Sequence, residues 1–206
     1  MRTPIFIVSG FLDSGKTTLA KEILKRAEEP QEWLVIICEH GDEEYGNEYE
    51  TVSIDAPENL DCSLFDDLQS RYPGRRFLIE YNGTWPLSKL YQIRLPKGLV
   101  IQNVTYVLDA ATAEPYILNM GPMLLEQMNF ADCFYFSKGT PGDRVIRLIR
   151  QLNQRATIRD AGSEEVMARI AREFNDGGEI TVKSRVYAVL LIIVVCILTC
   201  YYVNSF

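Results

Sequence analysis

The chain has 206 residues, and its 21 lysine and arginine residues against 28 aspartate and glutamate residues give a formal charge of −7. This length suits one ordinary domain with enough chain to bury a core. An acidic composition without a basic stripe argues against nucleic acid as a partner. The five cysteines include no C-x-x-C pair, which argues against a zinc ribbon and a disulfide framework.

Short apolar runs bounded by polar or turn residues predict strands that are buried on both faces. In chain order these runs are residues 5–8, 34–37, 77–79, 104–108 and 133–136, with weaker strands at 52–54 and 157–158. Amphipathic stretches between them predict helices at 16–27, at 63–71, on either side of Gly121-Pro122, around 145–152 and at 163–174. This alternation predicts an α/β fold with a mostly parallel sheet and helices on both of its faces.

The C-terminal end differs in composition from the rest. Residues 186–203 are 18 positions of which all but one are apolar or aromatic, and no charged residue follows Arg185. A helix of that length spans about 27 Å, close to the roughly 30 Å hydrocarbon core of a bilayer. We therefore expect a nucleotide-binding domain at 1–174, a linker at 175–185 and one transmembrane helix. Lys183 and Arg185 precede the span and no basic residue follows it, which predicts a single-pass C-terminal anchor in the cell membrane with the domain in the cytoplasm.

Residues 10–17 read Gly-Phe-Leu-Asp-Ser-Gly-Lys-Thr and match the phosphate-loop pattern G-x-x-x-x-G-K-[ST]. The motif follows the first predicted strand and opens the first predicted helix, as a P-loop requires. Its glycines, Gly10 and Gly15, let main-chain N–H groups curl around phosphates, and the helix N-terminus adds positive potential. Lys16 is predicted to reach the β- and γ-phosphates, and the Thr17 hydroxyl to coordinate Mg²⁺. The other nucleotide-binding residues expected in this loop are Asp13, Ser14 and Thr18, of which Asp13 places a carboxylate inside an anion-binding loop.

The segment GFLDSGKTTL is similar to the phosphate loop of the CobW-like P-loop GTPases, metallochaperone-type proteins related to the urease and hydrogenase nickel-insertion GTPases. Four further segments resemble family motifs in the same order: Cys38-Glu39-His40-Gly41, Ile79 to Gly83, Val107 to Ala110, and Glu126-Gln127 with Phe130-Ala131-Asp132. The resemblance covers residues 4 to about 160 and implies a P-loop NTPase that uses Mg²⁺ and GTP or another triphosphate. No counterpart of the family's C-terminal CobW domain is expected, and because no residue reads as an arginine finger, we expect slow turnover.

Glu80 ends a predicted strand beside the expected nucleotide site. A carboxylate there can hold Mg²⁺ through water or orient the attacking water, so Lys16 and Glu80 are the predicted catalytic residues. The family's guanine-reading N-K-x-D motif falls on residues 137–140, Ser-Lys-Gly-Thr. Lys138 can lay its stem along a base, whereas the Thr140 hydroxyl cannot reproduce the contact of a carboxylate with two guanine N–H groups. The choice between GTP and ATP therefore stays open.

The resemblance also implies a second metal site. The family's C-x-C-C motif falls on residues 59–62, where only one cysteine is present. A site made of Glu39, Asp61 and Cys62 would hold an additional divalent metal with harder ligands than three thiolates. A surface loop that keeps one ordinary cysteine is the alternative.

Two functions follow from these residues. The first is a membrane-anchored GTPase or NTPase that acts as a switch for a metal-handling or transport partner. The second is a non-catalytic nucleotide-binding subunit that regulates a membrane permease complex. Intact Lys16 and Thr17 favour the first function, and the departures at Asp13 and Thr140 favour the second. The expected partners are the bilayer, bound through the C-terminal helix, and a membrane permease or a metal-dependent client protein.

Overall fold

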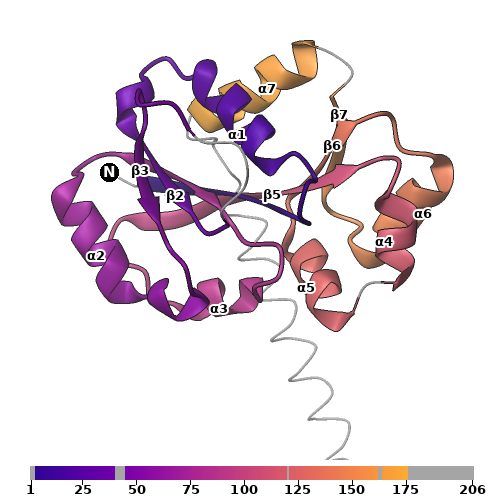
Figure 1. Cartoon of the computed structure of the whole chain (residues 1–206), viewed down its shortest axis with the longest axis horizontal. Coiled ribbons are helices and arrows are strands. Elements are labelled where there is room, and N and C mark those ends of the chain that lie inside the picture. Colours follow the sequence, from indigo (N-terminus) through magenta and orange to yellow (C-terminus); the bar gives the residue numbers. More distant parts are fainter. Residues whose placement is uncertain (1–2, 40–44, 120, 162–163, 176–206) are drawn as a thin grey trace, which may run out of the picture.

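The apolar runs form a seven-stranded sheet in which every pair of neighbouring strands is parallel (Figure 1). The computed structural model describes residues 3–39, 45–119, 121–161 and 164–175. The strands are β1 (Thr3–Gly10), β2 (Trp33–Ile37), β3 (Glu50–Ser53), β4 (Arg76–Glu80), β5 (Leu99–Asp109), β6 (Cys133–Lys138) and β7 (Thr157–Asp160). Their order across the sheet is β3-β2-β4-β1-β5-β6-β7, so β1 lies between β4 and β5.

Helices cover both faces of this sheet, as the alternation of elements predicted (Figure 1). They are α1 (Lys16–Lys25), α2 (Cys62–Arg71), α3 (Leu87–Gln92), α4 (Ala113–Asn119), α5 (Pro122–Phe130), α6 (Asp143–Leu152) and α7 (Glu164–Asn175), with 3-10 turns at Pro30–Glu32 and Pro57–Asn59. The helices α1 and α7 pack on one face, and α2 to α6 cover the other. The prediction of an α/β fold with a parallel sheet is confirmed, and the sheet is entirely parallel in the described residues.

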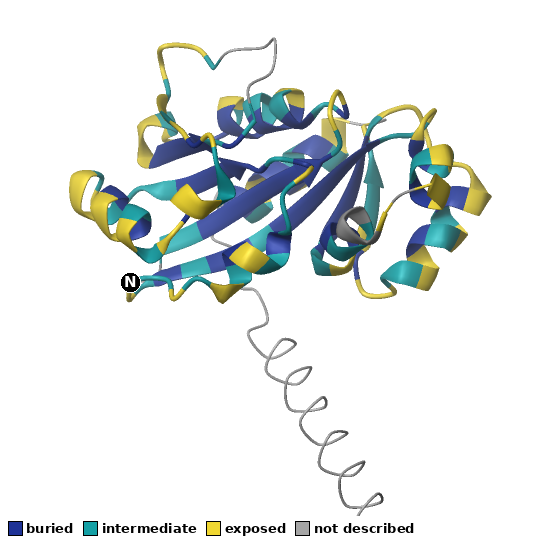
Figure 2. Ribbon diagram, turned by 60° about the horizontal axis from the view of Figure 1, so that its bottom comes forward, coloured by how far each residue is buried: buried dark blue, intermediate teal, exposed yellow. Residues whose placement is uncertain are grey.

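The sequence of the central strand β1 is apolar at consecutive positions because helices cover both faces of the sheet there. Ile5 and Ile7 pack toward α2 and α3, whereas Phe6 and Val8 pack toward α1 and α7, and all four side chains are at most 1% exposed. Burying each such side chain contributes about 1.5–3 kcal/mol of hydrophobic stabilisation. Figure 2 shows buried residues along the central strands and exposed ones on the outer sides of the helices.

Two elements differ from the sequence prediction. Strand β5 begins at Leu99 rather than at residue 104; the prediction was too short because the polar residues Gln102 and Asn103 interrupt the apolar run. Gln102 is an extra residue in the pairing with β1, where Ile5 pairs with Ile101 and Phe6 with Asn103. Helix α3 was not predicted. Its first N–H groups, those of Leu87 and Ser88, donate to the Glu126 carboxylate at 3.1 and 2.8 Å, so the cap comes from α5 and leaves no local signal.

The predicted transmembrane helix at 186–203 and linker residues 176–185 lie outside the described residues. Within the described ranges, no helix has the length and apolar character needed to cross a bilayer. The last element of the described residues is α7, which ends at Asn175.

Candidate nucleotide-binding site

The predicted site residues gather at the carboxyl edge of the sheet. Strand β1 ends at Gly10, β4 ends at Glu80, and β2 leads into Glu39. In open parallel sheets, ligands bind beyond the carboxyl ends of the strands, at the point where the strand order reverses. Strand β1 occupies that point, because the chain passes from it to β2 on one side and later continues through β5 to β7 on the other.

The phosphate loop depends on backbone conformations that most residues avoid. Gly10 and Gly15 have φ angles of 147° and 92°, and a Cβ atom at Gly10 would lie 2.4 Å from the Val107 carbonyl oxygen. Asp13 also adopts the left-handed region, with φ of 58°, and is exposed. Gly15 precedes the first residue of α1, so the unpaired N–H groups of that helix start face the end of the loop.

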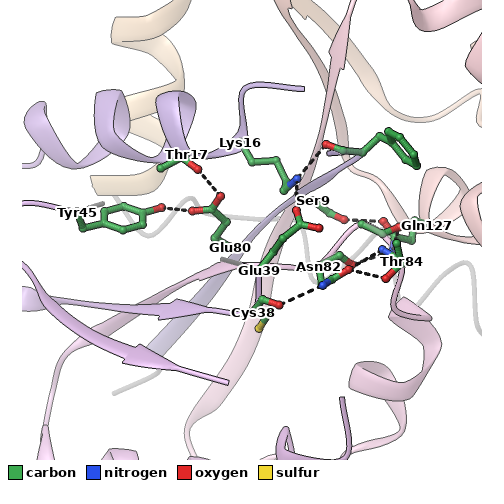
Figure 3. A network of polar contacts seen from close by, with 12 residues as sticks. Ser9, Lys16, Thr17, Cys38, Glu39, Tyr45, Glu80, Asn82, Thr84 and Gln127 are labelled. Carbon is green, nitrogen blue, oxygen red and sulfur yellow. Dashed lines mark hydrogen bonds and ion pairs between the residues drawn. The ribbon is translucent and has the colours of Figure 1, made fainter. Parts of the chain in front are cut away.

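Lys16 is the buried cation of the site. Its side chain is 4% exposed, and its Nζ atom donates to the Phe11 carbonyl at 2.9 Å and pairs with Glu39 Oε2 at 2.6 Å (Figure 3). An ammonium group buried this far is stable only among acceptor oxygens. The same surroundings suit phosphate oxygens, because their negative charge can take the place of the Glu39 carboxylate beside Lys16.

Glu80 joins the phosphate loop to the segment that follows β2. Its carboxylate is 3% exposed and accepts hydrogen bonds from Thr17 Oγ1 at 2.5 Å and from the Tyr45 hydroxyl at 2.6 Å (Figure 3). Thr17, the predicted Mg²⁺ ligand, and Glu80, predicted to hold Mg²⁺ through water, are therefore in direct contact. A hydroxyl and a carboxylate are the hard oxygen donors that Mg²⁺ prefers.

The loop also contains a buried hydroxyl without a partner. Among the described residues, Ser14 Oγ is buried and forms no hydrogen bond. Leaving such a group unsatisfied costs about 1–3 kcal/mol, and a phosphate oxygen in the loop would satisfy it. Thr18 lies exposed in the first turn of α1. The phosphate loop and the Thr17–Glu80 pair thus fit both the triphosphate and the metal that the sequence predicts.

The residues at the N-K-x-D position have divided roles. The Ser137 hydroxyl donates to the Ser14 carbonyl at 2.5 Å, so it stabilises the conformation of the phosphate loop. The Lys138 side chain is 67% exposed, and its Nζ lies 4.0 Å from Asp109 Oδ2. The exposed stem of Lys138 can therefore cover a base. Thr140 is also exposed, but its side chain has only a hydroxyl and a methyl group.

The predicted second metal site is not assembled. Glu39 pairs with Lys16, Asp61 caps α2 by accepting from the Leu64 N–H at 2.8 Å, and Cys62 donates to Asp66 Oδ2 at 3.5 Å. Within the described ranges, no three His, Cys, Asp or Glu side chains cluster in a way that would hold a metal ion. Desolvation and the hydrogen bond to Asp66 raise the pKa of the Cys62 thiol, which disfavours the thiolate that a metal needs.

Sequence reasoning missed four polar residues of this region. Tyr45 lies in a polar stretch for which no element was predicted, and Ser9 lies just beyond the strand predicted at residues 5–8. Asn82 and Gln127 occur in segments that carry the family resemblance, but no role was assigned to them. Ser9 and Gln127 are 118 positions apart in the chain, so only the fold reveals the hydrogen bond between them.

The parallel sheet, the glycine-rich loop and the Lys16–Thr17 start of α1 define a P-loop nucleotide-binding domain. Residues 4–59 match the family model "CobW/HypB/UreG, nucleotide-binding domain". Residues 4–59 are thus similar to the nucleotide-binding domain of the CobW/HypB/UreG proteins, and the predicted resemblance to the CobW-like P-loop GTPases is confirmed. A comparison with curated protein sequences finds no match.

Solved structures share the fold at low sequence identity. The Zn(II)-bound YjiA GTPase from E. coli is 20% identical with a TM-score of 0.56, and the match covers 77% of this chain and 57% of that one. The hydrogenase maturation factor HypB from Archaeoglobus fulgidus is 16% identical with a TM-score of 0.57, covering 82% of this chain and 88% of that one. HypB from Helicobacter pylori in complex with nickel is 14% identical with a TM-score of 0.55, covering 84% and 85%. This chain therefore spans little more than half the length of YjiA.

Proposed function

We propose that the domain binds a nucleoside triphosphate together with Mg²⁺ and hydrolyses it slowly, as a switch for a partner protein. The observation that carries this proposal is the grouping of Lys16, Thr17 and Glu80 at the carboxyl edge of the sheet. A buried ammonium group and a hydroxyl–carboxylate pair, both at the end of a phosphate loop, match the charges of a Mg²⁺–triphosphate.

Phosphoryl transfer requires the enzyme mainly to position the reactants and neutralise charge. In the proposed reaction, Lys16 exchanges the Glu39 carboxylate for oxygens of the β- and γ-phosphates. Thr17 directly and Glu80 through water would hold Mg²⁺, and the ion would supply positive charge that neutralises those oxygens. The Glu80 carboxylate lies at the end of β4 with Tyr45 on its second oxygen, and it orients the attacking water from there.

The partner is proposed to handle a metal or to transport one. The support comes from structural relatives, of which one is a Zn(II)-bound GTPase and another is a HypB protein in complex with nickel. Mg²⁺ at the nucleotide and a separate divalent metal carried for a client would be two distinct ions. The second would need ligands beyond Glu39, Asp61 and Cys62, because these three lie in separate contacts.

A non-catalytic subunit that regulates a membrane permease complex is the second candidate. Asp13 adds an exposed carboxylate to the tip of the phosphate loop, which weakens attraction for a triphosphate. At the position of the N-K-x-D motif, Ser137 binds the Ser14 carbonyl of the phosphate loop. Thr140 leaves a bound base without a carboxylate partner. Such a domain would hold nucleotide for regulation without turning it over.

We expect the full chain to release phosphate from both GTP and ATP in a Mg²⁺-dependent way, with a preference for GTP below a thousandfold. Loss of a charged hydrogen-bond partner removes about 1.5–3 kcal/mol of selectivity. Competition between the two nucleotides in a turnover assay measures the preference. The matched variant Thr140→Asp restores a carboxylate and should raise the preference for GTP. Binding without turnover would favour the regulatory subunit, and absence of any nucleotide binding would contradict both functions.

We also propose that residues 186–203 anchor the domain to the cell membrane, with the nucleotide site in the cytoplasm. The length and apolar character of this segment and the basic residues before it support the proposal. We expect the full chain to resist carbonate extraction from membranes, and a chain that ends at Gly178 to be soluble and to bind nucleotide equally well. Recovery of the full chain in the soluble fraction would refute the anchor.

A further inference from the structure

Gln127 is a buried polar residue that the proposed chemistry does not use. It lies on α5, is 0% exposed, and accepts a hydrogen bond from Ser9 Oγ at 2.6 Å (Figure 3). Its Nε2 atom donates toward three main-chain carbonyls, those of Asn82 at 3.3 Å, Gly83 at 3.2 Å and Trp85 at 2.6 Å. Since carbonyl oxygens only accept hydrogen bonds, the amide nitrogen must face them, and the amide oxygen is left for the Ser9 hydroxyl.

The three carbonyls belong to the turn that follows β4. This turn is closed by a hydrogen bond from the Trp85 N–H to the Asn82 carbonyl at 3.1 Å, and the Asn82 side chain accepts from the Thr84 N–H at 2.8 Å. The turn lies directly against the phosphate loop, because a Cβ atom at Gly83 would be 2.2 Å from the Gly10 carbonyl oxygen. Ser9, the other partner of Gln127, immediately precedes Gly10. One side chain thus ties the turn to the strand end from which the phosphate loop begins.

The same turn also reaches the end of β2. Asn82 Nδ2 donates to the Cys38 carbonyl at 3.3 Å, and the next residue, Glu39, pairs with Lys16 (Figure 3). The turn is therefore in contact with the phosphate loop on one side and with the segment that carries the partner of Lys16 on the other. A shift of the turn would move both at once.

We propose that Gln127 is a positioning residue for the nucleotide reaction, and that it holds the Asn82–Trp85 turn against the phosphate loop. This inference rests on the proposed function of the same site. Gln127 touches no reacting atom; it acts through the turn and through Ser9. Segments that follow strand ends in P-loop domains order around the third phosphate, so a misplaced turn should affect a triphosphate more than a diphosphate.

The test compares nucleotide binding by the full chain in detergent with that of Gln127→Met, which removes the amide group and keeps most of the volume. Calorimetry measures the dissociation constants for a non-hydrolysable triphosphate analogue and for the diphosphate, both with Mg²⁺. We expect triphosphate affinity to fall at least tenfold, while diphosphate affinity stays within threefold of wild type. A purely structural role would reduce the fraction of binding-competent protein for both nucleotides equally. Asn129→Met is the matched control, because it removes an exposed amide from the same helix and should change neither constant.

Ser9→Ala provides a milder variant if Gln127→Met folds poorly. It deletes one hydroxyl and frees the Gln127 amide to rotate, so the ratio of the two dissociation constants should shift in the same direction. An unchanged ratio in a folded Gln127→Met or Ser9→Ala protein overturns the inference. Failure of the wild-type chain to bind either nucleotide would instead refute the proposed function, so the two failures are distinguishable.

Discussion

Replacement of Lys16 by alanine should weaken triphosphate binding about a hundredfold. Hydrogen bonds that involve a charged group contribute about 1.5–3 kcal/mol, which corresponds to roughly 10- to 150-fold in affinity. The effect should lie toward the upper end, because the variant also leaves the Glu39 carboxylate, 14% exposed, without its cation and close to the incoming phosphates. Calorimetry on the full chain with Mg²⁺ and a non-hydrolysable analogue measures the loss.

Two variants serve as controls for this result. Lys25→Ala removes the same charge from the same helix, but its side chain is 62% exposed, so binding should not change. Glu39→Gln keeps Lys16 and removes the carboxylate that competes with phosphate for it, so binding should be at least as tight as in wild type. Equal binding by wild type and Lys16→Ala would show that residues 10–17 do not act as a phosphate loop.

The second large effect is expected for Glu80→Gln, which should lower Mg²⁺-dependent turnover by at least about a hundredfold. The substitution keeps the shape of the side chain but removes the charge that Thr17 and Tyr45 hold in place. Residues that transfer or orient protons at a reaction centre typically contribute 10²–10⁴-fold to the rate. Phosphate release measured over a range of Mg²⁺ concentrations reports both the rate and the metal dependence.

Glu58→Gln is the matched control for the loss of charge, since the Glu58 side chain is 69% exposed and pairs with Lys89 at the surface. It should retain wild-type turnover. A Glu80→Gln protein that hydrolyses nucleotide within a few-fold of wild type, with the same Mg²⁺ requirement, would remove Glu80 from the proposed reaction. Nucleotide binding in the absence of Mg²⁺ should differ little between wild type and Glu80→Gln.

Much of the fold could be predicted because buried parallel strands leave a continuous apolar run in the sequence. The strands β1, β2, β4 and β6 fall where such runs occur, and the phosphate loop has a fixed spacing of glycine, lysine and threonine. Strand β5 was predicted too short because polar residues interrupt its first half. Helix α3 escaped notice because its cap, Glu126, is distant in the sequence and only the folded chain brings it near.

The candidate site was predicted in part for a similar reason. A motif predicts Lys16 and Thr17 and a strand end predicts Glu80 at the same edge of the sheet, and in the structure Thr17 contacts Glu80 there. Glu39 was predicted as a ligand of a second metal, yet it pairs with Lys16, because the opposite charge closest in space is not visible along the chain. Tyr45 and Gln127 were missed because their hydrogen bonds join segments that no local pattern connects.

The packing of α7 has a consequence for the orientation of an anchored domain. Phe174 stacks on Phe6 with ring centroids 4.3 Å apart, and its carbonyl accepts from Arg76 at 3.4 Å. The ring centroids of Trp33 and Phe174 are 6.3 Å apart. Because Trp33 and Arg76 are the first residues of β2 and β4, α7 ends at the amino edge of the sheet. This is the edge opposite the phosphate loop.

Ten residues, 176–185, separate the end of α7 from the predicted span, and a fully extended chain of that length reaches at most about 35 Å. A domain tethered in this way would be attached to the lipid at its amino edge, with the nucleotide site on the opposite side of the domain. Exchange of spent nucleotide would then need no room at the attachment point, and a protein that reads the bound nucleotide could approach without meeting the tether.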